Sequence, residues 1–129
     1  MTNGEISDAA IRLSGETSAN DCPDYVTRSE RLLTLIYRSL APLDRDIRAA
    51  KGLDPQGTIT NPSSVNGICP LTDDLVPAVS YLLASFLTID ENASLSEVMR
   101  SHYEAAIADV RARIPMKGAS TKNVYPGIL

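Results

Sequence analysis

The chain has 129 residues, 43% hydrophobic and 22% charged, a balance typical of one globular domain rather than of a disordered chain. Its net charge of −4 argues against a DNA-reading domain, because such domains take most of their affinity from Lys and Arg on phosphates. No apolar run reaches the length of a membrane span, and the first residues lack a signal-peptide pattern, so we expect a cytosolic protein without a membrane segment.

Two helices are expected in the first half of the chain. Residues 5–18 form a short amphipathic helix, with Ile6, Ala10, Leu13 and Thr17 on one face. A second helix covers residues 25–41, because Thr27 and Glu30 fit a capping box and apolar residues then repeat at helical spacing. Pro42 ends or kinks this helix near Leu40, and residues 43–51 add a short further helical segment.

A long loop is expected over residues 52–72. Between Pro55 and Thr72 it carries no charged residue, and turn-forming residues separate two short β-prone pieces at 58–60 and 64–65. A short β-hairpin or an extended segment is therefore predicted. Since ordinary solvated loops carry charge, a loop of this kind lies either on its own domain or on another subunit.

A third helix is expected over residues 74–89, with Asp74 as its N-cap and Pro77 in its first turn. Its apolar surface is so broad that we expect neighbours on more than one side. A second capping box at Ser94 and Glu97 then opens a fourth helix, and the short connection between the two implies an antiparallel hairpin.

The fourth helix covers residues 94–114 and ends at Pro115. Arg100 and Glu104 are spaced for a surface ion pair. Eight residues line its apolar face: Leu95, Val98, Met99, Tyr103, Ala106, Ile107, Val110 and Ile114. Residues 115–129 follow as an extended tail. The fold class is thus all-α, a single domain with a bundle of about four helices, a long central loop and a C-terminal tail.

The residues show no catalytic constellation, so we expect no enzyme, no cofactor and no metal. His102 has no nucleophile or orienting carboxylate at a useful spacing. The carboxylate pairs Asp73-Asp74 and Asp90-Glu91 stand where helix caps and solvated loops belong. The acids of the fourth helix lack the Glu-x-x-His spacing of di-iron bundles, and no phosphate-binding or dinucleotide motif occurs.

Two cysteines, Cys22 and Cys69, are too few for a disulfide framework or a zinc site. We expect both to be reduced and partly buried. A bridge between them requires Cα atoms within about 7 Å of each other.

The uncharged loop and the apolar end of the tail are features that a monomeric bundle does not need. Either they pack on their own domain, or they reach neighbouring chains by strand addition or by inserting apolar side chains into a groove. The missing charge in the loop and the apolar tail tip favour the second interpretation. The predicted subunit or partner interface consists of Thr58, Ile59, Val65, Ile68, Val124, Tyr125 and Ile128. The broad third helix adds Val76, Tyr81 or Phe86 as places for a neighbouring subunit.

The order of these segments resembles the small helical head–tail connector (adaptor) proteins of long-tailed bacteriophages. The resemblance covers roughly residues 20–115. It rests on Asp24-Tyr25 before RLLTLIYRSLAPLDRDI, then the polar loop, then LTDDLVPAVSYLLASFLTIDEN, and finally EAAIADVRARIP.

The resemblance implies a virion structural protein at the head–tail junction, assembled in the bacterial host cytoplasm. A homo-oligomeric ring would dock beneath the portal protein, extend the DNA channel and join the capsid to a further tail or head-completion protein. DNA would pass through without sequence-specific binding, helped by an acidic wall that repels phosphate. The alternative is a small cytosolic helical protein-interaction or regulatory module with no assembly role.

Overall fold

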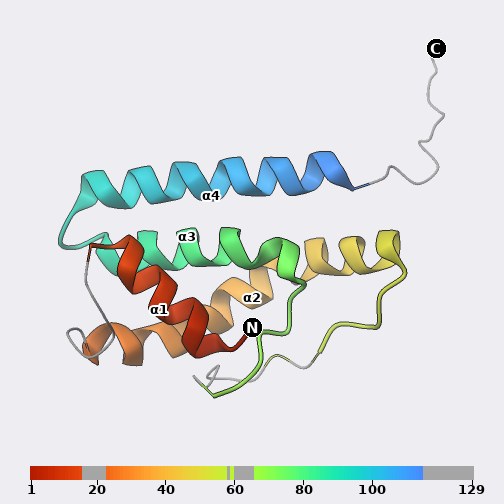
Figure 1. Ribbon diagram of the computed structural model, residues 1–129. Coiled ribbons are helices and arrows are strands. Elements are labelled where there is room, and N and C mark those ends of the chain that lie inside the picture. The colour runs from red at the N-terminus through yellow and green to blue at the C-terminus, as the bar shows by residue number, and fades with distance from the viewer. Residues whose placement is uncertain (16–22, 58, 60–65, 115–129) are drawn as a thin grey trace, which may run out of the picture.

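The computed structural model describes residues 1–15, 23–57, 59 and 66–114, and its architecture is an all-α bundle, as the sequence predicted (Figure 1). The described residues form four α-helices, one short 3-10 helix and no strand. In chain order the elements are α1 (Asn3–Leu13), α2 (Pro23–Lys51), the 3-10 helix η2 (Asp73–Leu75), α3 (Val76–Thr88) and α4 (Ala93–Arg113). The predicted tail, residues 115–129, lies outside the described residues.

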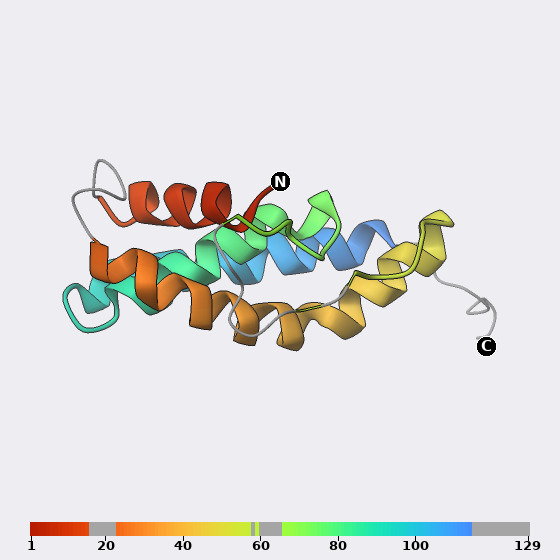
Figure 2. The ribbon, with the colours of Figure 1, turned by 90° about the horizontal axis from the view of Figure 1, so that it is seen from below.

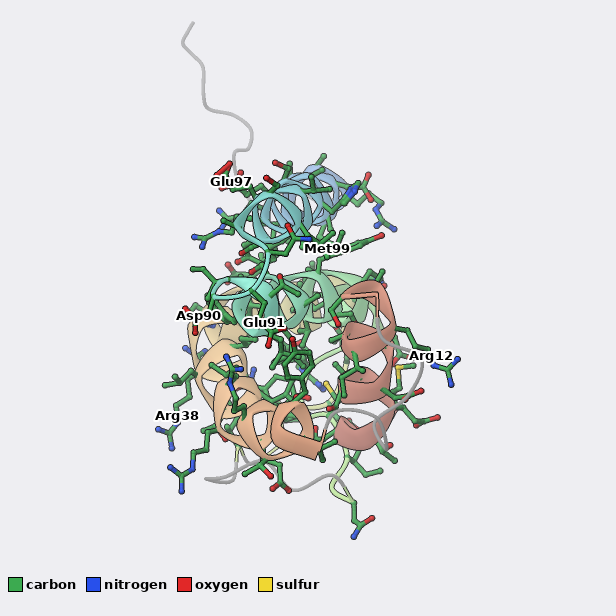
Figure 3. All side chains as sticks on the ribbon, turned by 90° about the vertical axis from the view of Figure 1, so that its left-hand side faces the viewer. Arg12, Arg38, Asp90, Glu91, Glu97 and Met99 are labelled. Atoms are coloured by element: carbon green, nitrogen blue, oxygen red, sulfur yellow. The ribbon has the colours of Figure 1, made fainter. Side chains whose placement is uncertain are left out.

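Helix α3 is the centre of the bundle. Helices α1 and α2 pack on one side of it and α4 packs on the other, where it forms an outer layer (Figure 3). Val79, Leu83 and Leu87 are fully buried in α3. The prediction that this helix has neighbours on more than one side is therefore confirmed. Most of the broad apolar surface of α3 is buried against helices of the same chain.

Helix α2 continues through Pro42, so the prediction that it ends near Leu40, with a separate short segment at 43–51, is wrong. Pro42 cannot donate to the carbonyl of Arg38, but both residues lie on the exposed face of α2, where solvent can hydrate that carbonyl. The buried face continues without interruption from Ile36 to Ile47. Burial of that face stabilises the helix on both sides of the proline more than the missing hydrogen bond destabilises it.

Both early helices begin before their predicted first residues. Thr2 caps α1, because its hydroxyl accepts from the Glu5 N–H while the Glu5 carboxylate accepts from the Thr2 N–H. The helix ends at Leu13, earlier than the predicted residue 18, and Gly15 follows with a φ of 98°. Helix α2 starts at Pro23, which needs no N–H in the first turn, so the predicted capping box at Thr27 lies inside the helix.

The caps predicted for α3 and α4 are also wrong. Asp74 lies in η2, and its carboxylate pairs with Lys51 instead of capping α3. Asn92 caps α4, since its side-chain oxygen accepts from the Leu95 N–H at 3.1 Å, and Ser94 is already helical. The role predicted for Pro77, in the first turn of α3, is confirmed.

The outer helix α4 buries fewer residues than its pattern predicted. Met99 and Val110 are buried against α3, but Val98 is 48% exposed and does not belong to the packed face. The ion pair on this helix joins Asp109 and Arg113 at 2.6 Å, rather than Arg100 and Glu104. Helix α4 therefore contacts α3 through a narrow stripe of buried side chains.

The described parts of the connection between α2 and η2 lie on the lower side of the bundle, which Figure 2 views from below. Gly52, with a φ of 68°, closes α2, and the Leu53 N–H donates to the Arg48 carbonyl at 2.9 Å. Residues 53–57 lie beside α2, and residues 66–72 lie beside the N-terminus and the start of α3. Apart from Ile59, which is not in a strand, the predicted hairpin pieces lie outside the described residues.

Candidate interaction surfaces

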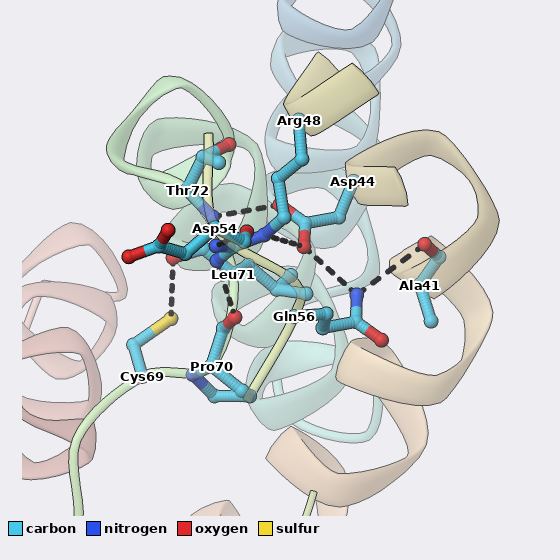
Figure 4. Close-up of polar contacts among 9 residues, drawn as sticks. All are labelled: Ala41, Asp44, Arg48, Asp54, Gln56, Cys69, Pro70, Leu71 and Thr72. Atoms are coloured by element: carbon cyan, nitrogen blue, oxygen red, sulfur yellow. Dashed lines mark hydrogen bonds and ion pairs between the residues drawn. The ribbon is translucent and has the colours of Figure 1, made fainter. Parts of the chain in front are cut away.

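The carboxylate of Asp44 is fully buried and hydrogen-bonds to residues at both ends of the connection between α2 and η2 (Figure 4). One of its oxygens accepts from Arg48 Nε and from Gln56 Nε2, both at 2.8 Å. The other oxygen accepts from the Thr72 N–H, also at 2.8 Å. A single side chain of α2 therefore holds both the beginning and the end of the connection.

The Arg48 guanidinium extends this network to two backbone carbonyls. Its Nη1 donates to the Asp54 carbonyl and its Nη2 to the Pro70 carbonyl, each at 2.9 Å. Gln56 also donates to the Ala41 carbonyl at 3.3 Å, which ties the connection to the turn of α2 that contains Pro42. These contacts hold residues 54–56 and 70–72 in place although neither segment has regular secondary structure.

Asp44 is charged at neutral pH. Burial alone raises its pKa, but the hydrogen bonds from Arg48, the Thr72 N–H and Gln56, together with the Arg48 charge, lower the pKa below its ordinary value of 3.8. Sequence reasoning missed this residue. The available signal was an acid on the buried face between Leu40 and Ile47, with an arginine four residues later.

The N-terminus holds the second end of the connection in place. The Asn3 N–H donates to the Gly67 carbonyl and the Cys69 N–H donates to the Met1 carbonyl, both at 2.9 Å. Asn3 is fixed in turn, since its side-chain oxygen accepts from the buried Tyr37 hydroxyl at 2.6 Å. Burial raises the pKa of Tyr37, which keeps this hydroxyl protonated and able to donate.

Ile68 projects from this held segment with 69% of its surface exposed. It is paired with Thr2 through the backbone alone, as an isolated antiparallel bridge. Ile59, by contrast, is half-buried and packs against the core of its own domain. The other predicted interface residues lie outside the described residues: Thr58, Val65, Val124, Tyr125 and Ile128.

An open apolar groove lies between α2 and α3, with a volume of about 650 Å³. Leu35 and Ile89 are its most exposed apolar residues, at 61% and 56%. Among the predicted neighbour-binding positions of α3, Phe86 lines this groove, while Val76 and Tyr81 do not. The apolar lining consists of Leu32, Leu35, Ile36, Leu82, Phe86 and Ile89.

The described residues contain no candidate metal-binding cluster. No group of three or more His, Cys, Asp or Glu side chains gathers among them. The His102 ring packs beside the Tyr81 ring, with centroids 5.1 Å apart. Glu91 accepts from the Tyr25 hydroxyl, so it contributes to packing between α2 and the α3–α4 turn.

Cys69 carries a free thiol that is buried, and burial raises its pKa. Cys22 lies outside the described residues. Among the helices that the structure describes, none has the length and apolarity needed to cross a membrane. Comparisons of the chain with protein-family models, with curated proteins and with solved structures find no significant match.

Proposed function

We propose that the protein is a virion structural protein, a head–tail connector that forms a ring of identical subunits beneath the portal of a tailed bacteriophage. The observation that carries the proposal is Ile68, a large apolar side chain that is 69% exposed on a segment held from two sides. An isolated exposed apolar residue is ordinary in a protein surface. One that is fixed by hydrogen bonds within a stretch that carries no charge from Pro55 to Thr72 is suited to contact a neighbouring subunit.

The hydrogen bonds at the two ends of the connection lower the entropic cost of such a contact. Asp44 and Arg48 hold its two ends on α2, and the backbones of Met1 and Asn3 hold residues 67 and 69. A segment that is already ordered loses less conformational freedom when a neighbour binds it. In a ring, each Ile68 would contact the next subunit by a head-to-tail interface, the kind that closes on itself.

The charge of the chain supports the same function. A net charge of −4 suits a subunit whose ring surrounds passing DNA, because an acidic wall repels phosphate and leaves the duplex free to slide. The proposed partners are further copies of the chain, the portal protein and a tail or head-completion protein. The proposed location is the head–tail junction of the virion, after assembly in the host cytoplasm.

Substitution of Ile68 by Asp tests the proposal. The purified protein is mixed with the portal protein encoded in the same genome, and assembly is followed by sedimentation velocity and negative-stain microscopy. We expect wild type to form rings and Ile68→Asp to remain monomeric with an unchanged circular dichroism spectrum. Val98→Asp, which changes an exposed apolar residue on α4, is the matched control and should still assemble.

The possible outcomes distinguish a failure of the connector function from a failure of the Ile68 contact. Rings from both variants would leave the connector function standing and remove Ile68 from the interface. A wild-type protein that stays monomeric or dimeric with the portal present would contradict the connector function. In that case the second candidate, a small helical protein-interaction module, is favoured by the open groove between α2 and α3.

A further inference from the structure

Helices α2 and α3 run antiparallel, and such a pair leaves one groove along each side. Lys51 pairs with Asp74 where α2 ends and α3 approaches, and Tyr25 contacts Glu91 at the opposite end. Helix α1 packs against both α2 and α3 on one side of the pair (Figure 3). It contributes Ile6, Ala10 and Ile11 to the core, all fully buried.

The groove on the other side has no helix in it among the described residues. Along α2 it extends from Arg28 to Ser39, which is about 17 Å at the rise of an α-helix. Helix α1, with 11 residues, is about 16 Å long. The open groove is therefore about as long as the helix α1 that fills the opposite groove. Ile36, Leu82 and Phe86 are among the residues that line the open groove.

Arginines border the groove. Arg28 and Arg31 line its rim, and Arg38 projects outward about two turns further along α2 (Figure 3). Arg28 lies over the Tyr25 ring, with its guanidinium carbon 5.8 Å from the ring centroid, and donates to the Phe86 carbonyl at 3.5 Å. No ion pair involves Arg31 or Arg38 within the described part of the chain.

This charge limits what can occupy the groove. Two copies that met groove to groove would bring Arg31 and its neighbours against the same arginines of the partner, which is unfavourable. The chain's own residues 115–129 include Lys117 and Lys122 and no acid, so they match the rim poorly. An occupant with carboxylates matches it well.

We propose that the α2–α3 groove docks an amphipathic helix from a different protein, one with an apolar stripe flanked by Asp or Glu. Helix α1 illustrates the required chemistry, since it places Ile6 and Ala10 on the core and carries Glu5 and Asp8 outside. Apolar anchors at helical spacing are how helices bind such grooves. The flanking carboxylates meet Arg28 and Arg31, which sets orientation and partner choice. This docking does not depend on ring formation.

A displayed peptide library tests the proposal with a defined probe. The library holds 14-residue helical peptides with fixed Leu residues at one face and random residues at the flanking positions. Wild-type protein is used for selection, and the double variant Leu35→Asp/Ile89→Asp is used to remove peptides that bind elsewhere. We expect enriched peptides to carry Asp or Glu at the flanks, and their Kd to weaken at least tenfold with Leu35→Asp.

Two charge variants and a control complete the test. The double variant Arg28→Glu/Arg31→Glu should bind the acidic peptides more weakly and should bind versions with Lys at the flanks more tightly. Val98→Asp should change neither affinity. Both Leu35 and Ile89 are more than half exposed, so their variants should fold, as thermal unfolding will check. The proposal is overturned if no groove-dependent peptide is selected, if the flanks are neutral or basic, or if Leu35→Asp converts a dimer into a monomer.

Discussion

Asp44 and Arg48, one turn apart on α2, form an ion pair of 2.8 Å that holds both ends of the connection between α2 and η2. The carboxylate is fully buried, while the arginine side chain keeps 18% of its surface exposed. The pair thus holds residues 54–56 and 70–72 against α2, the longest of the described helices. The position of Ile68, and with it the proposed subunit contact, depends on this network.

Replacing Asp44 by Asn should destabilise the fold by about 2–3 kcal/mol, because the Arg48 charge loses its partner and an amide nitrogen faces the donors of Arg48 and Gln56. The value lies toward the low end for a buried pair because Arg48 reaches solvent. Urea unfolding measures the change. Asp46→Asn, on the exposed face of the same helix, is the matched control and should change stability by less than about 0.5 kcal/mol. Equal effects of the two substitutions would contradict the role assigned to Asp44.

The stability of the protein should fall in acid partly through Asp44. The folded pKa of this residue lies below its ordinary value of 3.8, so its contribution is fully present above that value and disappears as the pH falls through the folded pKa. Tm measured between pH 2 and pH 6 should therefore drop less steeply in Asp44→Asn than in wild type. Glu5, whose pKa is lowered chiefly by the Thr2 N–H, is present in both proteins and cancels in the comparison. Parallel curves would refute this assignment.

The helices were predictable because apolar residues repeat at helical spacing, but their first residues were not. The pattern of Ser or Thr followed three residues later by Glu occurs five times, at Thr2, Thr27, Thr88, Ser94 and Ser101. It caps a helix only at Thr2, and the other four residues belong to helices themselves. Tertiary burial decides which of several equivalent local signals is used.

The anchoring network could not be predicted for a different reason. The partners of Asp44 outside α2 are Gln56 and Thr72, 12 and 28 residues away in sequence. Local patterns carry no information on such contacts. The sequence contains one partial indication of the groove. Among the apolar residues of α2, Leu35 lies outside the buried stripe formed by Leu33, Ile36 and Leu40.

The Cys69 thiol should react slowly with iodoacetamide in the folded protein at pH 8. Burial both blocks access and raises its pKa, so little of the reactive thiolate is exposed. A Cys22→Ser background isolates the reaction, which mass spectrometry follows with time. Addition of urea should accelerate labelling to the rate of an unfolded thiol. Rapid labelling of the native protein would mean that residues 66–72 open far more readily than their hydrogen bonds imply.

Deletion of residues 124–129 should leave the helical bundle intact and weaken assembly. The segment contains Val124, Tyr125 and Ile128, which we propose to contact neighbouring chains. The far-ultraviolet circular dichroism and Tm of the truncated protein should match those of wild type, while its assembly with the portal protein should require a higher concentration. If truncation instead lowers Tm substantially, these residues belong to the core of their own domain.

The central claim is that copies of this chain close into a ring on the portal. Native mass spectrometry combined with negative-stain microscopy tests it most directly, using the full chain alone and with the portal protein of the same genome. The account predicts one closed oligomer of defined mass and a central channel, formed by the chain alone or on addition of the portal. A monomer or compact dimer whose mass is unchanged by the portal would contradict it.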